Sequence, residues 1–205
     1  MLHFSEDDLG ALDKIYRLNL INSITGYKSA NLIATKSKSG QTNVAVFNSI
    51  IHLGSNPALL GFILRPLTVP RHTYSNLKET GHFSVNHIHK DHIAAAHHTS
   101  AKYPKDISEF DKTSLDVEYK EGIEVPFVKE APIQIACDYV NEYLIEENDT
   151  LLIIGKMTHI YLQPQMVAED GWVQLDKGNI VSINGLDGYA LPQLLERFDY
   201  ARPKK

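Results

Sequence analysis

Hydrophobic and polar residues alternate along much of this chain, with the period of two that is typical of β-strands. Three such runs, ANLIATKS, TNVAVFNSIIHL and LLGFILRP, are separated by turn-forming residues. The pattern therefore predicts three strands over residues 30–37, 42–53 and 59–66. A shorter run, FSVNHI at 83–88, predicts a fourth.

Two longer alternating runs follow in the second half of the chain. PIQIACDYVNEYLIEE (132–147) and TLLIIGKMTHIYLQP (150–164) are separated only by the turn-forming residues of ENDT, which predicts a long antiparallel hairpin. In each of these two strands, the period of two places alternate side chains on one face. These sets are Ile133, Ile135, Cys137 and Tyr139 in the first strand, and Leu151, Ile153, Met157 and Tyr161 in the second.

Helical patterns are short. A first helix is expected from Ser5, which can cap it, with acidic residues at 6–8 and an apolar stripe of Leu9, Leu12, Ile15 and Tyr16. Further helices are expected over 71–83, ending near Gly81, over 90–98, and over 188–200. The expected fold is mainly β, an antiparallel sheet or barrel with short peripheral α-helices, in one domain spanning 1–205.

Composition narrows the classes of protein that fit. Apolar residues make up 43% of the chain, charged residues 22%, and the formal net charge is −5. These values are ordinary for a soluble globular protein, and the negative charge argues against nucleic acid as a general partner. The single cysteine, Cys137, excludes an intrachain disulfide and leaves a thiolate zinc site without enough ligands. Without a signal-like segment or a long apolar run, we expect a cytoplasmic protein that does not enter a membrane.

The segment GFILRPLTVPRHTYSNLKETG carries the most chemical information. A strand ends at Arg65, and Arg71 and Thr73 stand where a helix begins. Helix starts offer free backbone N–H groups, and arginines add forked donors, so the segment favours a phosphate-type anion site. An equally consistent interpretation is that Thr73 only caps the helix and both arginines are solvated. Neither GxGxxG nor GxxxxGK[ST] is present, so a Rossmann site and a P-loop are not supported.

Five of the ten histidines fall within NHIHKDHIAAAHHTSAKYP. His87 and His89 would share one face of a strand, which could supply two metal ligands. The remaining spacings do not match an i, i+4 helical pair, because His92 and His97 are five residues apart. We therefore favour solvated histidines over an evolved metal or haem site and predict no metal ligands.

Five segments in order resemble the flavin reductase-like family of the FMN-binding split-barrel fold. RHTYSNLKETGHFSVN resembles the family run K-D-T-x-x-N-I-x-x-T-G-x-F-x-V-N, and TSAKYPKDISEFDKTSL resembles S-A-x-x-P-x-x-x-x-E-F. TNVAVFNSIIHLGSNPALLGFIL precedes them, and the two hairpin strands and NGLDGYALPQLLERFDYARP follow. Together they cover residues 32–203. The resemblance implies a split barrel, a homodimer, and FMN in a groove near the dimer interface.

The resemblance also implies site residues. Arg65, Arg71, Thr73 and Asn76 would surround the FMN phosphate and the helix behind it. The chain departs from the family at the usual Lys-Asp, which is Arg71-His72 here. The flavin ring would meet Phe47, Asn48, Ser49 and Ile50, and its edge would meet Ser100, Lys102 and Tyr103 of the same or the partner subunit.

The implied activity is an NAD(P)H-dependent flavin reductase, with NADH or NADPH giving hydride to FMN. Such chemistry belongs to the two cofactors, so no nucleophile or triad is expected. His52 and Lys102 are the nearest candidates for proton delivery, although a structural role fits His52 better. Three alternatives stay open: an electron-transfer or other FMN-dependent oxidoreductase that uses NAD(P)H poorly, a haem- or metal-binding barrel, and a pyridoxamine-phosphate oxidase-like enzyme.

Overall fold

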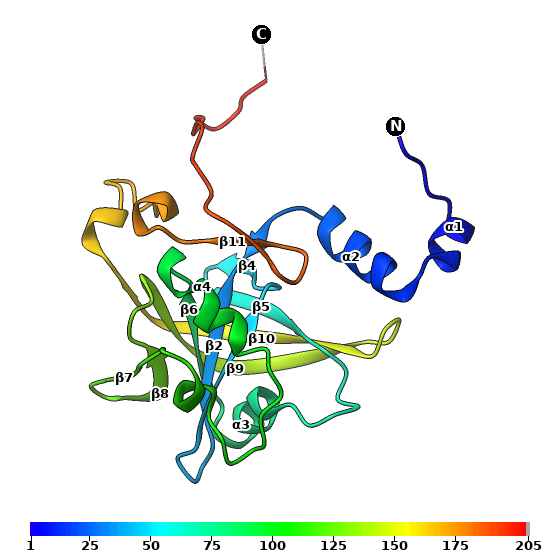
Figure 1. The fold of residues 1–205 in the computed structure, drawn as a ribbon. Coiled ribbons are helices and arrows are strands. Elements are labelled where there is room, and N and C mark those ends of the chain that lie inside the picture. Colours follow the sequence, from blue (N-terminus) through cyan, green and yellow to red (C-terminus); the bar gives the residue numbers. More distant parts are fainter. Residues whose placement is uncertain (204–205) are drawn as a thin grey trace.

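The computed structural model describes residues 1–203, and its centre is a curled, seven-stranded antiparallel sheet (Figure 1). In spatial order the strands are β3 (Thr42–Phe47), β2 (Asn31–Lys36), β6 (His82–His87), β9 (Ile133–Ile145), β10 (Thr150–Leu162), β5 (Ala58–Leu64) and β4 (Ile51–Ser55). The two ends of this sheet meet where Ser49, between β3 and β4, hydrogen-bonds through Oγ to the main-chain N–H and C=O of Ile63. The mainly β, antiparallel fold class is thus confirmed.

Smaller elements surround the sheet. The other strands are β1 (Lys28–Ser29), β11 (Ser182–Asn184) and β12 (Gly188–Ala190), which form a three-stranded sheet, and β7 (Val117–Lys120) and β8 (Ile123–Val128), which form a hairpin. The α-helices are α1 (Glu6–Ala11), α2 (Lys14–Ile24), α3 (His72–Thr80) and α4 (Ile93–His98). Four 3-10 turns are η1 (Lys90–His92), η2 (Glu109–Lys112), η3 (Pro164–Met166) and η4 (Leu175–Gly178). None of the helices within residues 1–203 is long and apolar enough to cross a membrane.

Strand alternation divides the core into an inner and an outer layer. On β2, Ile33 points into the barrel, while Leu32 and Ala34 point outward to a second cluster that includes residues of α4, β8 and β11. α3 contributes Leu77, only 1% exposed, to the inner cluster. α3 ends at Gly81, whose φ of 76° is left-handed and whose N–H bonds Leu77 C=O, as the sequence predicts.

Two strand predictions need correction. Residues 42–53 form not one strand but two, because the chain leaves β3 at Phe47 and crosses to the opposite end of the sheet before β4 begins. Tyr161 does not share the inner face of Leu151 and Ile153. It packs against Phe127 in a separate cluster, since β10 carries two register shifts before it.

Both predicted terminal helices also differ from the structure. The first is broken in two at Asp13, whose carboxylate accepts from the N–H groups of Ile15 and Tyr16 and so caps a second helix, α2. The expected helix over 188–200 is absent: β12 occupies 188–190, and residues 191–200 are exposed and without regular structure. The apolar side chains of that tail touch no core of this chain, so nothing favours folding it into a helix.

Candidate functional site

The N-terminus of α3 presents several N–H groups that have no hydrogen-bond acceptor within the helix. Arg71 is its N-cap and makes no side-chain capping bond. The first helical bond runs from Ser75 N to Arg71 O at 3.0 Å, so the preceding N–H groups of His72, Thr73 and Tyr74 have no partner within the helix. The Nε of Arg71 is buried and has no hydrogen-bond partner. Buried donors of this kind require an acceptor, and a phosphate oxygen at a helix N-terminus is one that fits.

Polar side chains beneath this helix end hold it in place. Asn43 Nδ2 donates to Thr73 Oγ1 at 3.1 Å, and Asn76 Nδ2 donates to Thr35 Oγ1 at 3.1 Å. All four side chains are buried. Thr73 Oγ1 acts as the acceptor here, which leaves its O–H free to donate. Thr73 and Asn76 therefore position α3. Of the predicted phosphate ligands, Arg71 has a buried Nε with no partner, and Thr73 keeps an unused O–H.

A cavity of about 340 Å³ lies beside α3. One wall is α3, the second is the β2–β3 turn, and the third is the segment 105–107 that follows the TSAKYP loop. The lining consists of hydroxyls, amides, a histidine, a lysine, an aspartate and an isoleucine: Ser37, Ser39, Gln41, Thr42, Asn43, His72, Asn76, Lys105, Asp106 and Ile107. Of these, Asn76 is the one that the sequence analysis assigned to the site. The predicted phosphate ligands Arg65, Arg71 and Thr73 are not among them, and Arg65 is exposed at the end of β5.

The segment 47–50 is fixed by contacts to three other parts of the chain. Asn48 Nδ2 donates to Gly185 O at 2.9 Å, Ser49 bonds Ile63 as described above, and Ser29 Oγ donates to Ile50 O at 3.3 Å. Phe47 packs edge-on against a core phenylalanine at 5.3 Å. The Asn48 and Ser49 side chains, which were expected to meet the flavin ring, are thus engaged inside the chain. What the segment still offers a ligand is its backbone groups and the Asn48 Oδ1 atom.

β3 runs from the α3 end of the predicted site to the 47–50 segment, where the flavin ring is expected. Asn43 stands at the α3 end of the strand and Phe47 at the other, four residues apart, which corresponds to roughly 13 Å. The outer edge of β3 is partly closed by Glu109, whose carboxylate accepts from Val44 N at 3.0 Å. Burial raises the pKa of Glu109, while the Val44 N–H opposes that rise. By strand alternation, the N–H of Val46 points to the same side as that of Val44.

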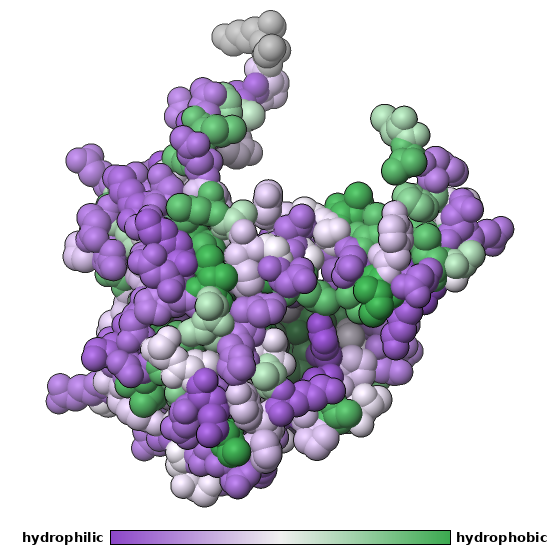
Figure 2. Space-filling view, in the orientation of Figure 1, coloured by the Kyte–Doolittle hydropathy of each residue, from purple (hydrophilic) through white to green (hydrophobic). Residues whose placement is uncertain are grey.

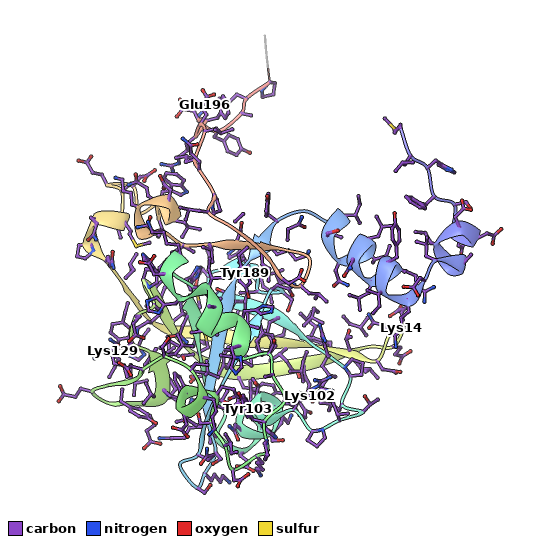
Figure 3. The ribbon with its side chains drawn as sticks, in the orientation of Figure 1. Lys14, Lys102, Tyr103, Lys129, Tyr189 and Glu196 are labelled. Atoms are coloured by element: carbon purple, nitrogen blue, oxygen red, sulfur yellow. The ribbon has the colours of Figure 1, made fainter. Side chains whose placement is uncertain are left out.

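The TSAKYP loop lies between α4 and η2, and Figure 3 shows Lys102 and Tyr103 on it. Ser100 and Lys102 are exposed, while Tyr103 Oη stands 2.7 Å from Nε2 of His98. The loop leads directly into residues 105–107 of the cavity wall. The structure therefore brings α3 and the segment that follows this loop to one cavity, whereas Ser100, Lys102 and Tyr103 are not among the residues that line it.

The remaining candidate side chains are scattered. His52 is exposed on β4. Burial lowers the pKa of His87 to about 4, so this histidine is neutral at pH 7. Elsewhere in the cluster, His97 Nδ1 lies 3.3 Å from Tyr189 Oη and His98 contacts Tyr103. Across residues 1–203, no three His, Cys, Asp or Glu side chains stand together in a way that could hold a metal ion.

Comparison with known proteins agrees with this geometry. The family model "Flavin reductase like domain" matches residues 27–175. A split-barrel protein from Shewanella frigidimarina, for which flavin reductase activity has been proposed, is 40% identical, with a TM-score of 0.95 over 98% of this chain and 100% of that one. Nitrilotriacetate monooxygenase component B from Bacillus cereus shares the fold, at 22% identity and a TM-score of 0.80 over 98% of each chain.

A relative of uncharacterized function from Halalkalibacterium halodurans is 26% identical over 177 residues, 83% of both chains. The matched family segment contains the whole of β2–β10, α3 and the TSAKYP loop. It thus spans the cavity, the 47–50 segment and both predicted arginines. The chain belongs to the flavin reductase-like family and has its FMN-binding split-barrel fold.

Proposed function

We propose that this protein binds FMN and acts as an NAD(P)H-dependent oxidoreductase of the flavin reductase type. The observation that carries the proposal is the buried, unpartnered Nε of Arg71 at the uncapped start of α3, in a member of this family. Arg71 and the α3 N–H groups would hold the phosphate, with Arg65 reinforcing them from the end of β5. The backbone of 47–50 would support the ring. A homodimer is the assembly that we propose for it.

The chain's own residues would bind and orient rather than react. FMN, when bound, supplies two-electron hydride acceptance from a nicotinamide, and the protein supplies position and electrostatics. The roughly 13 Å from Asn43 to Phe47 sets the separation between the phosphate end and the ring end. Ser29, Asn48 and Ser49 keep the ring end in place through their hydrogen bonds.

The test is the absorbance spectrum of the purified protein before and after anaerobic NADH and NADPH. We expect a flavin band that one donor bleaches. A flavin band that neither donor bleaches would favour the alternative, an FMN-dependent electron-transfer or other oxidoreductase. A colourless protein that also fails to bind added FMN would refute the flavin assignment.

The binding roles are tested with the double variant Arg65→Ala and Arg71→Ala. Removing both phosphate donors should abolish FMN retention and leave the circular dichroism spectrum unchanged, because neither side chain belongs to a core cluster. Arg202→Ala, at an exposed arginine of the C-terminal tail, is the matched control and should retain FMN. Equal FMN affinity in the double variant would place the phosphate elsewhere.

Lys102 is proposed as the proton donor near the ring, because the family resemblance places its loop at the ring edge. His52, exposed on β4, is proposed to take no part and serves as the control. Lys102→Met should lower the reductase rate several-fold and change its pH profile, while His52→Gln should leave both unchanged. A Lys102→Met enzyme with the wild-type pH profile would remove this lysine from the mechanism.

A further inference from the structure

The last two residues of helix α4, His97 and His98, each contact a tyrosine from another part of the chain. Nε2 of His98 stands 2.7 Å from Oη of Tyr103, in the TSAKYP loop. Nδ1 of His97 stands 3.3 Å from Oη of Tyr189, in β12, and the two rings meet edge-on at 5.8 Å. Both histidines are exposed, whereas both tyrosines are half-buried. Each histidine is therefore a hydrogen-bond partner of a tyrosine, and not a side chain that only faces water.

The contact with His98 anchors the middle of the TSAKYP loop. The N–H groups of residues 100 and 101 donate to the last two carbonyls of α4 at 3.0 Å each, and so fix the start of the loop. From Lys102 to Asp106, no main-chain N–H donates to a main-chain oxygen of residues 1–203. Lys102 is exposed, and Figure 2 shows hydrophilic residues at the surface where Figure 3 labels it. The contact between Tyr103 and His98 therefore holds the part of the loop that carries Lys102.

The contact with His97 leads to the segment where the flavin ring is expected. Tyr189 lies in β12, which pairs with β11. The turn between these two strands contains Gly185, whose C=O accepts from Asn48 Nδ2 at 2.9 Å. Burial raises the pKa of Tyr189 to about 12, so the phenol keeps its proton at pH 7 and can donate it to His97 Nδ1. α4 is thus joined through His97 to the hairpin that holds the 47–50 segment.

We propose that His97 and His98 are positioning residues that hold the TSAKYP loop in a fixed place relative to the 47–50 segment. The two histidines are adjacent in one helix, so both tyrosine contacts start from the same rigid backbone. If the proposed function holds, a flavin ring on the 47–50 segment has Lys102 at its edge only while the loop keeps this place, so the role of the histidines rests on that function. Each histidine acts through its tyrosine and needs no contact with the ring.

Amide side chains test the His98 contact at the level of single atoms. A glutamine amide reaches the position of Nε2 in a histidine, and an asparagine amide reaches that of Nδ1. His98→Gln should therefore keep the Tyr103 contact and the wild-type kcat with NADH or NADPH, while His98→Asn should lower kcat about tenfold. FMN affinity should not change in either variant, because the phosphate end of the site is untouched. Tyr103→Phe should match His98→Asn, and combining the two should lower kcat no further. Equal rates for the two amides, or losses that add in the double variant, would overturn the proposal.

His97 provides a matched control, because its contact uses the other ring nitrogen. At this position asparagine should keep the wild-type kcat and glutamine should lower it, so the order of the two amides is reversed on the neighbouring residue. The same order at both positions would mean that side-chain length, and not the hydrogen bond, decides the rate. That result would refute the positioning role.

Limited trypsin digestion of the full chain gives a measurement that needs no flavin. Trypsin cleaves after lysine, and Lys102 is exposed in the loop. Cleavage after Lys102 should be about tenfold faster in His98→Asn and Tyr103→Phe than in wild type and His98→Gln. Equal cleavage in all four proteins would contradict the proposal, as would faster cleavage with an unchanged kcat. If the wild type neither retains FMN nor oxidises NADH or NADPH, the proposed function fails, while the cleavage rates still decide whether His98 holds the loop.

Discussion

The two ends of the barrel interior are built differently, and β2 runs from one to the other. Asn31, Ile33 and Thr35 share its inner face, so the strand is polar at both ends and apolar between them. At the α3 end, Thr35 accepts from Asn76 at 3.1 Å. At the other end, Asn31 Nδ2 donates to Ser29 Oγ at 2.9 Å, but its Oδ1 has no partner.

The same contrast extends to the neighbours of these residues. Asn43 and Thr73 are paired beside Thr35. Ser182, opposite Ser29 in the β1–β11 pairing, has an unpartnered buried Oγ, and Asn184, two residues further, has an unpartnered Oδ1. The side chains beneath α3 are thus paired with one another, and the unpartnered buried atom at that end is the donor Nε of Arg71. At the opposite end, three buried side-chain oxygens lack partners.

The largest change in stability is expected at the α3 end of the barrel, where Leu77 packs α3 against the core. Leu77 is 1% exposed and joins the inner core, so Leu77→Ala should reduce the free energy of unfolding by about 2–5 kcal/mol. Urea denaturation would measure this loss in the free energy of unfolding. Lys78→Ala, at the neighbouring exposed position, is the control and should cost less than about 1 kcal/mol. A similar loss for both variants would mean that α3 is not anchored through Leu77.

The second-largest change in stability is expected at the opposite end of the barrel, near Asn31, and it depends on pH. Burial lowers the pKa of His87, opposite Asn31, to about 4, whereas an unfolded chain has a histidine pKa near 6.5. The unfolded state therefore binds the proton first, and stability should fall as the pH drops from 6.5 towards 4, by about 3 kcal/mol at most.

Thermal unfolding across that pH range checks this dependence against His87→Gln, which has no proton to gain. The slope of the wild type between pH 6.5 and 4 should be steeper than that of the variant. Parallel curves would show that His87 titrates normally in the folded state. The end of the barrel near Asn31 would then be more hydrated than its burial indicates.

The sequence predicted the elements whose signals are local. Most strands of the central sheet, the hairpin with its ENDT turn, and the end of α3 at Gly81 were visible as periodicity or turn chemistry, but β4 was not separated from β3. The break at Asp13 had a local signal too, since aspartate is a strong N-cap, but the apolar stripe running past it concealed the boundary. Strands β7, β8, β11 and β12 were not predicted. They are short and pair β7 with β8 and β11 with β12, and β11 also pairs with the distant β1.

Only part of the candidate site followed from the sequence, and that part as separate residues rather than as an arrangement. Arg71 and Thr73 follow from a helix start, yet nothing in the sequence shows that Thr73 pairs with Asn43 while Arg71 keeps a buried free donor. Lys105 and Gln41 reach the cavity through tertiary contacts between segments more than 60 residues apart. For the same reason, the engagement of Asn48 by Gly185 could not be foreseen.

The smallest effect gives the sharpest test of the two ends, because it compares two buried asparagines. Asn76→Leu removes the donor from Thr35 and leaves a buried hydroxyl unpaired, which should cost about 1–3 kcal/mol. Asn31→Leu loses one bond to Ser29 but also removes an oxygen that had no partner, so its cost should be about 1 kcal/mol smaller. Both side chains are at most 4% exposed, so burial alone predicts equal costs. Equal losses in urea denaturation would mean that Asn31 Oδ1 is satisfied in solution, and the contrast between the two ends would then lie in hydration rather than in unmet bonds.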